Sequence, residues 1–415
     1  MRLELITIGD ELLLGLTIDT NAAYLARELA ALGVSVVRRA TGADDASEIA
    51  SAVRDALERT GAVITTGGLG PTSDDLTRSA IADLFGRELV PDEARWEALR
   101  ALWKERGRGE IPLTNRAQIM IPAGADVLDN RHGTAAGIFV EDDRGRWCAM
   151  LPGVPREMRG MVADALLPVL TRRLGGERRV VRSRTLRTTS IAESHLAERL
   201  GPLATGVNGL SLAYLPGQDG VDLRVTVRDL SPEAADDALS AAIGALRGRV
   251  GPYAYGEERD DLAAIVLGLC KERGLRIAVG ESCTGGLLGA RLTAIPGSSA
   301  VVDGGVIAYS NAVKTALLGV PAELIAQHGA VSEPVALVMA HGARQRTGAD
   351  VGIGITGVAG PDGGTPEKPV GLVWIAVASG DTAKARGPRL VGDRAEIRYR
   401  ATQAALDMVR RLLAD

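Results

Sequence analysis

The sequence predicts an α/β protein of three domains, and three observations support this fold class. The chain has 415 residues, which at about 150 residues per domain indicates roughly three hydrophobic cores. Short apolar strands alternate with amphipathic helices in residues 1–170 and again in residues 253–415. Between these two regions, residues 171–252 differ in composition, beginning with an arginine-rich stretch, and predict a small α+β unit.

The first domain opens with a repeated strand–helix pattern. We expect strands at residues 3–9, 34–41 and 62–68 and helices at residues 21–32 and 44–59. Gly33 follows the first helix, as is typical just past a helix C-terminus. This order predicts a parallel sheet covered on both faces, with ligands binding at the carboxyl ends of its strands.

The middle domain is expected to have the order β-α-β-β-α-β. Ser190 and Glu193 suggest a capping box, residues 210–216 and 221–227 form a hairpin, and a helix covers residues 231–247. Residues 171–187 are rich in arginine, and residues 206–209 read GVNG, which could suggest nucleic acid. A GxxG clamp should join two helices, whereas this one precedes a strand, so we prefer a solvated face and a loop.

The last domain repeats the strand–helix pattern. We expect helices at residues 260–273 and 287–292, a helix opened by Ser332 and a final helix, with strands at residues 275–281, 301–310, 351–357 and 371–379.

Scarce residue types limit the chemistry. The chain has 3 Cys, 4 His and five Lys, and no Cys or His spacing indicates a zinc site or a disulfide scaffold. The acidic N-terminal segment is not a signal peptide, and apolar runs such as residues 262–270 are too short to span a bilayer. We therefore expect a cytoplasmic protein. A net charge of −4 with few aromatic residues argues against direct nucleic-acid binding.

The first domain carries a glycine-rich loop and three acidic strand ends. The loop at residues 65–75 follows a buried strand, and its glycines would let backbone amides approach a phosphate. The phosphate-binding candidates are Gly67, Gly68, Gly70 and Thr72. The acidic candidates are Asp10, Glu11, Asp44, Asp45, Asp74 and Asp75. Each acid alone could be a helix cap, whereas together they could hold a divalent metal against a diphosphate.

Two further polar segments in this domain stand out. Residues 130–137 form a polar, glycine-containing loop before a strand, and residues 151–158 form a turn that opens a helix. For the second segment, the pattern alone favours a proline-fixed helix start.

Three loops of the last domain follow strands and place Ser or Thr beside Gly. They are residues 280–286, 296–299 and 354–362. A Ser nucleophile needs a base, and since no His lies among these loops, a desolvated Lys314 is the natural candidate. Tyr309 could relay a proton or orient Lys314. Cys283 is an alternative nucleophile at a helix start, but it has no evident base, and we prefer to interpret it as a small buried core residue.

The motifs in their order resemble one known family. GDELLLGLTIDTN, TTGGLGPTSDDLT, LPGVPREM, ESCTGG, GSS, YSNAVK, GAVS and TGVAGPDGG closely resemble the competence/damage-inducible CinA family over essentially the whole chain. The resemblance implies a molybdopterin-binding-like three-layer domain, a KH-like linker domain and a C-terminal nicotinamide mononucleotide deamidase domain.

The resemblance also implies residues for the deamidase. The site would comprise Ser282, Thr284, Gly285, Gly286, Ser299, Tyr309, Lys314 and Thr356, with Arg394 or Arg398 contacting substrate. Lys314 would deprotonate a serine that attacks the carboxamide, and no cofactor is expected. We favour Ser299 as nucleophile and Ser282 as the oxyanion or proton-relay partner, and the reverse assignment stays open.

For the first domain, the resemblance implies an ADP-ribose pyrophosphatase that uses cobalt or magnesium, with potassium. The six acidic residues would share the metal. The small-molecule partners would be nicotinamide mononucleotide and ADP-ribose, and a homodimer is expected. Two alternatives stay open: a deamidase whose first domain only binds nucleotide, and an adaptor in competence or DNA repair.

Overall fold

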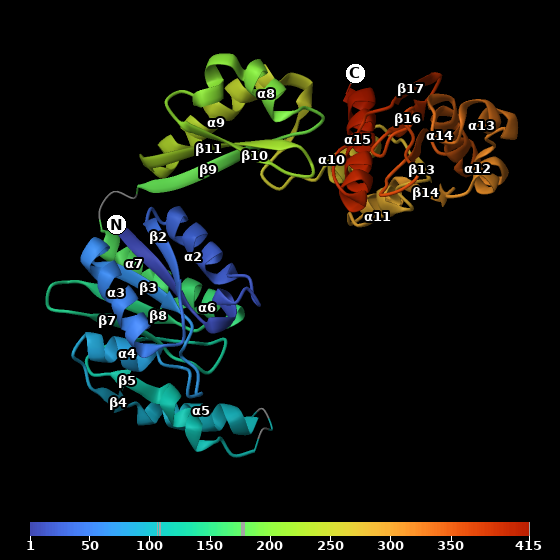
Figure 1. Cartoon of the computed structure of the whole chain (residues 1–415). Helices are drawn as coiled ribbons and strands as arrows, with labels where there is room; N and C mark the ends of the chain where they lie inside the picture. The colour runs from blue at the N-terminus through green and yellow to red at the C-terminus, as the bar shows by residue number, and fades with distance from the viewer. Residues whose placement is uncertain (106, 108, 176–178, 415) are drawn as a thin grey trace. The chain divides into compact units, whose positions relative to one another are not determined.

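The structure is a computed structural model that describes residues 1–105, 107, 109–175 and 179–414 (Figure 1). Part of the arginine-rich stretch, residues 176–178, therefore lies outside the described residues. The chain forms two compact units. The first contains Met1–Arg182 with Val227–Ala238, and the second contains Ser183–Thr226 with the chain from Leu239 onward.

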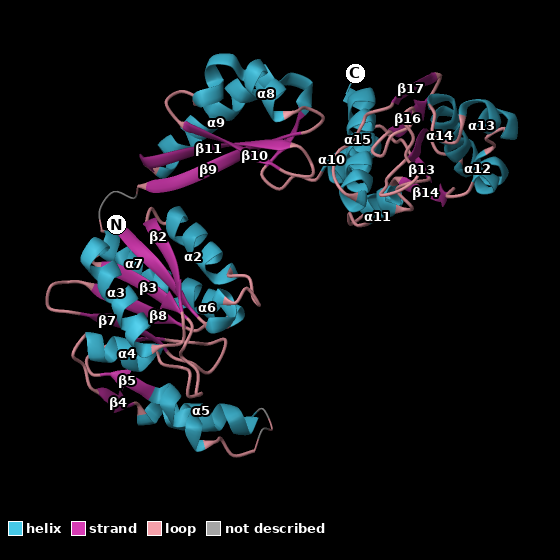
Figure 2. Cartoon of the chain, in the orientation of Figure 1, coloured by secondary structure: helices cyan, strands magenta, loops and turns pink. Residues whose placement is uncertain are grey.

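The N-terminal domain is built on a six-stranded sheet of order β2-β1-β3-β8-β7-β6 (Figure 2). Its strands are β1 (Arg2–Ile8), β2 (Ser35–Gly42), β3 (Ala62–Thr66), β6 (Asp126–Leu128), β7 (Gly137–Glu141) and β8 (Trp147–Leu151). The strands β2, β1, β3 and β8 are parallel, β7 runs antiparallel to β8, and the edge strand β6 pairs antiparallel with β7. The expectation of a parallel sheet is therefore wrong at β7, because the short turn between β7 and β8 can join only antiparallel strands.

Helices cover both faces of this sheet. The helical segments are α1 (Asp10–Leu13), α2 (Thr20–Ala31), α3 (Ala46–Thr60), α4 (Thr77–Leu84), α5 (Glu93–Glu105), η1 (Leu113–Ile119), α6 (Pro155–Met161), η2 (Val162–Leu166) and α7 (Leu167–Leu174). One core joins the sheet to α2 and α6 through residues such as Leu25 and Met158. A second core joins it to α3 and α4 through Val53 and Ile81. The domain is thus the three-layer α/β architecture that the sequence predicts. A two-stranded sheet, β4 (Leu89–Pro91) with β5 (Met120–Pro122), accompanies it.

The middle domain has the predicted β-α-β-β-α-β order. Its elements are β9 (Val180–Thr188), α8 (Glu193–Leu200), η3 (Gly201–Thr205), β10 (Ser211–Pro216), β11 (Val221–Leu230), α9 (Pro232–Val250), η4 (Gly251–Tyr253) and β12 (Ala254–Glu257), in a sheet of order β10-β11-β9-β12. Because β12 pairs with β9, residues assigned from sequence to the last domain complete this sheet instead. The capping box is also wrong: α8 begins at Glu193 after Ala192, while Ser190 adopts a φ of 60°.

The C-terminal domain contains a five-stranded sheet of order β14-β13-β15-β16-β17. Its elements are α10 (Leu262–Glu272), β13 (Ile277–Glu281), α11 (Leu287–Thr293), η5 (Ser298–Ala300), β14 (Val302–Ile307), α12 (Asn311–Leu318), α13 (Ala322–His328), α14 (Glu333–Thr347), β15 (Val351–Gly357), β16 (Val373–Ser379), β17 (Thr382–Arg386) and α15 (Arg394–Ala414). The strands β14, β13 and β15 are parallel, so their carboxyl ends share one edge. Helices α10, α11 and α15 pack in the larger core of this domain, and α14 packs through Ala336 and Ala340.

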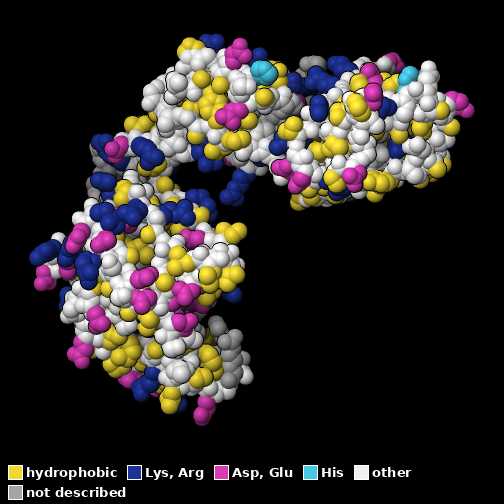
Figure 3. Space-filling model, in the orientation of Figure 1, with side chains coloured by type: hydrophobic (Ala, Val, Ile, Leu, Met, Phe, Trp, Pro, Cys, Tyr) yellow, Lys and Arg dark blue, Asp and Glu magenta, His cyan; other side chains and the backbone are white. Residues whose placement is uncertain are grey.

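Two further observations concern membrane-spanning helices and the distribution of surface charge. Among the described residues, no helix is long and apolar enough to cross a membrane. On the face drawn in Figure 3, basic and acidic side chains lie interspersed over the C-terminal part of the chain.

Candidate active site

Lys314 is the buried amine at the shared strand edge of the C-terminal domain. It lies in the first turn of α12, whose N-cap Ser310 accepts a hydrogen bond from the Val313 amide. Only 2% of Lys314 is exposed. Its Nζ lies 2.9 Å from Ser282 Oγ and donates to the carbonyl oxygens of Ala308 at 2.9 Å and Tyr309 at 3.3 Å. The structure therefore joins Lys314 to Ser282, which follows β13 directly.

These three neighbours suit a neutral lysine. A neutral amine has two N–H groups, which the two carbonyls can accept, and one lone pair, which can face the Ser282 hydroxyl. Burial lowers the pKa of Lys314, because removal from water disfavours the ammonium form. The geometry and the lowered pKa are compatible with a base positioned on a serine hydroxyl.

Glu281 holds the loop that carries Ser282. Its carboxylate is 1% exposed and accepts hydrogen bonds from the amides of Gly286 at 3.0 Å, Leu288 at 3.1 Å and Gly289 at 2.8 Å. The loop turns through Gly285 and Gly286, whose φ values of 59° and 92° favour glycine. The Ser282 amide donates to Ile355 on β15. The serine is thus held from two neighbouring strands and one helix start.

Two arginines of α15 reach the same edge. Arg394 donates to Tyr309 Oη at 2.9 Å and to the Gly360 carbonyl at 2.5 Å. Arg398 donates to the Thr284 carbonyl at 2.6 Å. Because these arginines are one helical turn apart, they share one face of α15 and contact the loops after β13, β14 and β15. Tyr309 is 60% exposed, so this face opens to solvent.

The remaining predicted residues are placed differently. Thr356 is buried and donates to the Ala330 carbonyl at 2.8 Å, and Thr284 is buried with an unpartnered Oγ1. Ser299 lies exposed in η5, and within the described part of the chain no hydrogen bond joins it to Lys314. Cys283 is buried, and burial raises the pKa of its thiol to about 12, which disfavours a thiolate.

A second candidate site lies at the carboxyl ends of β1, β2 and β3 in the N-terminal domain. Asp10 and Asp44 face each other: the Asp10 amide donates to Asp44 Oδ2 at 3.0 Å, and the Asp44 amide donates to Asp10 Oδ1 at 3.3 Å. Burial and the neighbouring charges of Asp10, Glu11 and Asp74 raise the pKa of Asp44. The charges of Asp10, Glu11 and Asp74 therefore act on Asp44 at this edge.

Asp45 and Asp75 have other partners. Asp45 is the N-cap of α3 and accepts from the amides of Ser47 and Glu48. Asp75 accepts from the amides of Gly70 at 2.6 Å and Thr72 at 2.8 Å, which folds the glycine-rich loop on itself. The expected cluster of six acids thus divides into four at the strand edge and two that cap or close local structure.

The glycine-rich loop is closely packed. A Cβ at Gly67 would overlap the Ile8 carbonyl, and a Cβ at Gly68 would overlap the Thr77 side chain. Arg78 is buried beneath the loop and donates to the Leu69 carbonyl at 2.9 Å. The glycines are therefore required for chain packing, whatever ligand the loop binds.

The described residues form no closed metal centre by themselves. Within residues 1–105, 107, 109–175 and 179–414, no three His, Cys, Asp or Glu side chains are placed to hold a metal ion. The charge cluster still suits a cation that arrives with a substrate, because Mg²⁺ is commonly held by one or two carboxylates plus substrate phosphates.

Sequence reasoning missed two anchoring residues. Glu281 could have been found as an acid that ends an apolar strand and precedes a glycine turn. Asn21 donates to Thr66 Oγ1 at 3.2 Å and to the Gly153 carbonyl at 2.7 Å, so it ties the start of α2 to the ends of β3 and β8. No local pattern of apolar residues signals that role for Asn21.

The polar segments at residues 130–137 and 151–158 lie together. Asn130 donates to Glu157 Oε2 at 2.7 Å, and His132 lies 3.0 Å from an Asp164 oxygen. Pro155 opens α6, in agreement with the proline-fixed helix start.

Comparison with known protein families accounts for nearly the whole chain. Residues 4–172 match the family described as "Probable molybdopterin binding domain", residues 183–256 match "Damage-inducible protein CinA KH domain", and residues 259–413 match "CinA C-terminal domain".

Individual proteins and solved structures are also similar to this chain. The chain is 63% identical over 414 residues to a CinA-like protein of Gemmatimonas aurantiaca, covering 100% of this chain and 97% of that protein. It is 44% identical over 410 residues to a CinA-like protein of Gloeobacter violaceus, covering 98% and 96%. Among solved structures, competence/damage inducible protein CihA from Agrobacterium tumefaciens is 42% identical, with a TM-score of 0.36, covering 37% of this chain and 94% of that one.

Proposed function

The chain belongs to the CinA family, and we propose that its C-terminal domain hydrolyses the carboxamide of nicotinamide mononucleotide to give nicotinate mononucleotide and ammonia. One observation carries the proposal: a buried lysine of lowered pKa lies 2.9 Å from a serine hydroxyl at a strand edge. This pairing is the chemistry that serine amidohydrolysis needs when no histidine is available.

The proposed mechanism has two balanced steps. Neutral Lys314 accepts the Ser282 proton while Oγ forms a bond to the carboxamide carbon, and the resulting tetrahedral intermediate expels ammonia with the proton returned from Lys314. Water then gives a proton to Lys314 and attacks the ester, and the C–O bond to Ser282 breaks as Oγ recovers a proton. Backbone amides near residues 283–284 would stabilise the oxyanion of both intermediates.

We assign substrate binding to the arginine face of α15. Arg394 and Arg398 are cations within reach of the loops that flank the dyad, and guanidinium groups match a phosphate in charge and geometry. Tyr309, held by Arg394, offers an exposed ring beside the lysine. Substrate phosphate on the arginines would direct the nicotinamide ring toward Ser282.

The test measures ammonia release from nicotinamide mononucleotide by purified full-length protein. Lys314→Ala and Ser282→Ala should each lower kcat by about 10²–10⁴, while the exposed Lys384→Ala should retain wild-type turnover. Unchanged turnover in Lys314→Ala would refute the lysine-assisted mechanism.

Two further measurements distinguish Ser282 from Ser299 as the nucleophile. Mass spectrometry of rapidly quenched reactions should find the acyl group on Ser282, and Ser299→Ala should keep more activity than Ser282→Ala. An acyl group on Ser299 would reverse the assignment and return Ser282 to a proton-relay role.

We propose a second activity for the N-terminal domain, hydrolysis of ADP-ribose to AMP and ribose 5-phosphate. The supporting observation is the repelling acid cluster around Asp10 and Asp44 beside a glycine-rich loop. When bound with substrate, a divalent metal held by these two carboxylates would neutralise diphosphate charge.

The test is ADP-ribose cleavage with cobalt or magnesium, with and without potassium. Asp44→Asn should abolish AMP formation, whereas Asp45→Asn, which alters only a helix cap, should retain it. If no metal supports cleavage by the wild type, the domain is a nucleotide-binding module instead.

A further inference from the structure

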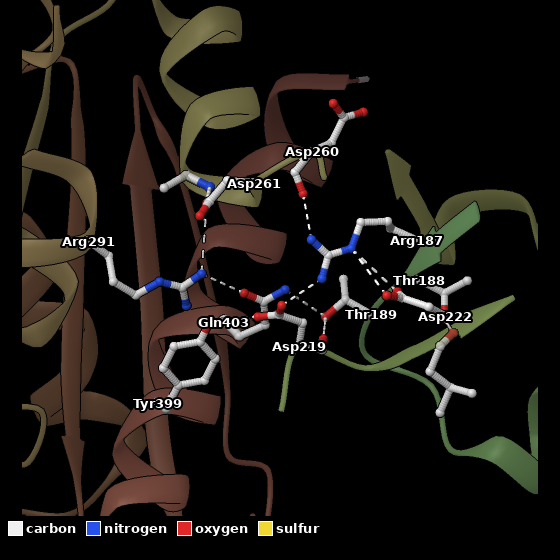
Figure 4. A network of polar contacts seen from close by, with 12 residues as sticks. Arg187, Thr188, Thr189, Asp219, Asp222, Asp260, Asp261, Arg291, Tyr399 and Gln403 are labelled. Atoms are coloured by element: carbon white, nitrogen blue, oxygen red, sulfur yellow. Dashed lines mark hydrogen bonds and ion pairs between the residues drawn. The ribbon is translucent and has the colours of Figure 1, made fainter. Parts of the chain in front are cut away.

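The hairpin turn between β10 and β11 of the middle domain contacts α15 of the C-terminal domain, and both belong to the second compact unit. Figure 4 shows the contact, with Arg187, Asp219 and Asp222 on the middle-domain side and Arg291, Tyr399 and Gln403 on the other. The contact is polar and largely buried: Gln403 is 3% exposed and Thr189 is 1% exposed. Buried polar groups arranged this way impose one geometry on the elements they join.

Asp219 is the centre of the contact. Its Oδ1 accepts a hydrogen bond from Tyr399 Oη at 2.7 Å, and its Oδ2 accepts from Arg187 Nη2 at 2.7 Å. Its backbone carbonyl accepts from Thr189 Oγ1 at 2.7 Å, so the turn is held to the end of β9. The Asp219 carboxylate is therefore fixed on the middle domain before it meets Tyr399.

The turn has little freedom to move. Gly220 has a φ of 152°, and a Cβ there would overlap the Thr188 carbonyl, so the hairpin lies directly against β9. Thr188 also donates to the Val221 carbonyl at 2.6 Å. A rigid turn can set the position of a helix that bonds to it.

The partner residue Tyr399 lies next to the substrate-side arginines. Arg394 and Arg398 contact Tyr309, Gly360 and Thr284, and Tyr399 follows Arg398 directly in α15. Since the helix is continuous from Arg394 to Ala414, fixing Tyr399 also fixes the rotation and axial position of the turn that carries both arginines.

A second set of contacts joins α15 to α11, the helix that follows the serine-bearing loop. Arg291 on α11 lies over the Tyr399 ring, 4.5 Å from its centroid, and donates to Thr402 Oγ1 and Gln403 Oε1, each at 2.9 Å. Gln403 in turn donates to Thr189 Oγ1 of the middle domain at 3.4 Å. Burial and the hydrogen bond to Asp219 raise the pKa of Tyr399 to about 12, so its hydroxyl remains a donor at neutral pH.

We propose that the Asp219–Tyr399 hydrogen bond is a positioning contact through which the middle domain sets the substrate-binding arginines of α15. This inference rests on the proposed deamidase function, in which Arg394 and Arg398 bind substrate and Lys314 and Ser282 carry out the chemistry. Asp219 and Tyr399 are positioning residues, since they act through α15. The middle domain thereby becomes part of the substrate-binding apparatus, beyond its place as a linker.

The test compares Tyr399→Phe with Tyr214→Phe in the full-length protein. Tyr214 Oη donates to the Ala204 carbonyl within the middle domain, so its loss is a matched removal of one hydroxyl that does not reach α15. Tyr399→Phe should raise KM for nicotinamide mononucleotide roughly three- to tenfold with kcat within about twofold of wild type. Tyr214→Phe should leave both parameters unchanged.

Partial unfolding would give a different pattern, because a smaller active fraction lowers apparent kcat and leaves KM alone. Asp219→Ala, which removes the acceptor of the Tyr399 hydroxyl, should reproduce the KM effect, and adding Tyr399→Phe to it should cause no further rise, since both remove the same contact. Additive effects in the double variant, or an unchanged KM in Tyr399→Phe, would overturn the proposal.

A readout independent of turnover separates this inference from the proposed function. Hydrogen exchange in peptides covering residues 394–405 should be roughly three- to tenfold faster in Tyr399→Phe and unchanged in Tyr214→Phe. If wild-type protein does not deamidate the substrate, the proposed function fails while the exchange result still decides the contact. Equal exchange in wild type and Tyr399→Phe would refute the contact even in an active enzyme.

Discussion

Glu281→Gln tests how the serine-bearing loop is held. The two carboxylate oxygens accept three amides, with Gly286 and Leu288 on Oε2 and Gly289 on Oε1. A glutamine keeps only one carbonyl oxygen, so at least one amide loses its acceptor and meets an NH2 group instead. A buried donor left unsatisfied costs about 1–3 kcal/mol, and the lost charge at the start of α11 costs about 0.3–2 kcal/mol.

The sum is a destabilisation of roughly 1–5 kcal/mol, which for a unit of this size lowers Tm by about 3–20 °C. Differential scanning calorimetry of the full-length protein should show this shift in the transition of the second unit. Because Ser282 is the next residue in the chain, kcat for nicotinamide mononucleotide should fall with it.

The matched control is Glu396→Gln at the start of α15. Glu396 Oε2 accepts a single amide, that of Asp393 at 2.9 Å, near the surface, so the same substitution should cost well under about 1 kcal/mol. A Tm for Glu281→Gln within 1–2 °C of the control would show that the three amide contacts do not stabilise the loop, and the reasoning would be wrong.

Three further predictions concern titration and reactivity. The kcat/KM for deamidation should rise with pH as Lys314 loses its proton, and the midpoint of the rise should lie below the ordinary lysine value of 10.5, because burial lowers the pKa of Lys314. A pH–rate profile that falls with rising pH, or whose midpoint is not below 10.5, would contradict this. Asp44→Asn should raise Tm at pH 7, because the raised pKa of Asp44 means that its charged form is disfavoured in the folded state. This gain in Tm should shrink as the pH falls toward 3.8, where the wild-type carboxyl is protonated. A lower Tm for the variant at pH 7 would refute the repulsion. In the native protein, Cys283 should not react with iodoacetamide at pH 8, and activity should be retained, since Cys283 is buried and burial raises the pKa of its thiol to about 12. Rapid inactivation on labelling would favour a cysteine nucleophile.

Much of the local structure follows from the sequence. The alternation of apolar strands and amphipathic helices predicted the three-domain α/β class, and the comparisons with known families confirm it. Loops after β3, β13 and β15 were found because glycine beside Ser, Thr or Asp at a strand end is a local pattern. The antiparallel pairing of β7 with β8 and the place of β12 were missed, because pairing partners leave no periodicity in a strand's own residues.

In the candidate site, too, the sequence indicated the residue types but not which residues contact one another. Sequence alone pointed to Lys314 as the candidate base, since histidine is scarce and this lysine stands beside a strand-end loop. It favoured Ser299 over Ser282 as nucleophile, whereas the structure places Ser282 beside Lys314, because both serines lie in glycine-containing strand-end loops and the choice depends on ångström-scale distances across strands. It also could not separate Asp45 and Asp75 from the acids at the strand edge, since capping and metal binding use the same carboxylate.

What the sequence by itself determined are the fold class, the domain order and the residue types available for chemistry, because these depend on periodicity and composition along the chain. What only the tertiary structure decided is which groups meet: Lys314 with Ser282, Glu281 with the start of α11, and Asp219 with Tyr399, which lies 180 residues away in the chain. Such contacts are set by strand order, helix rotation and burial, and those are properties of the packed molecule.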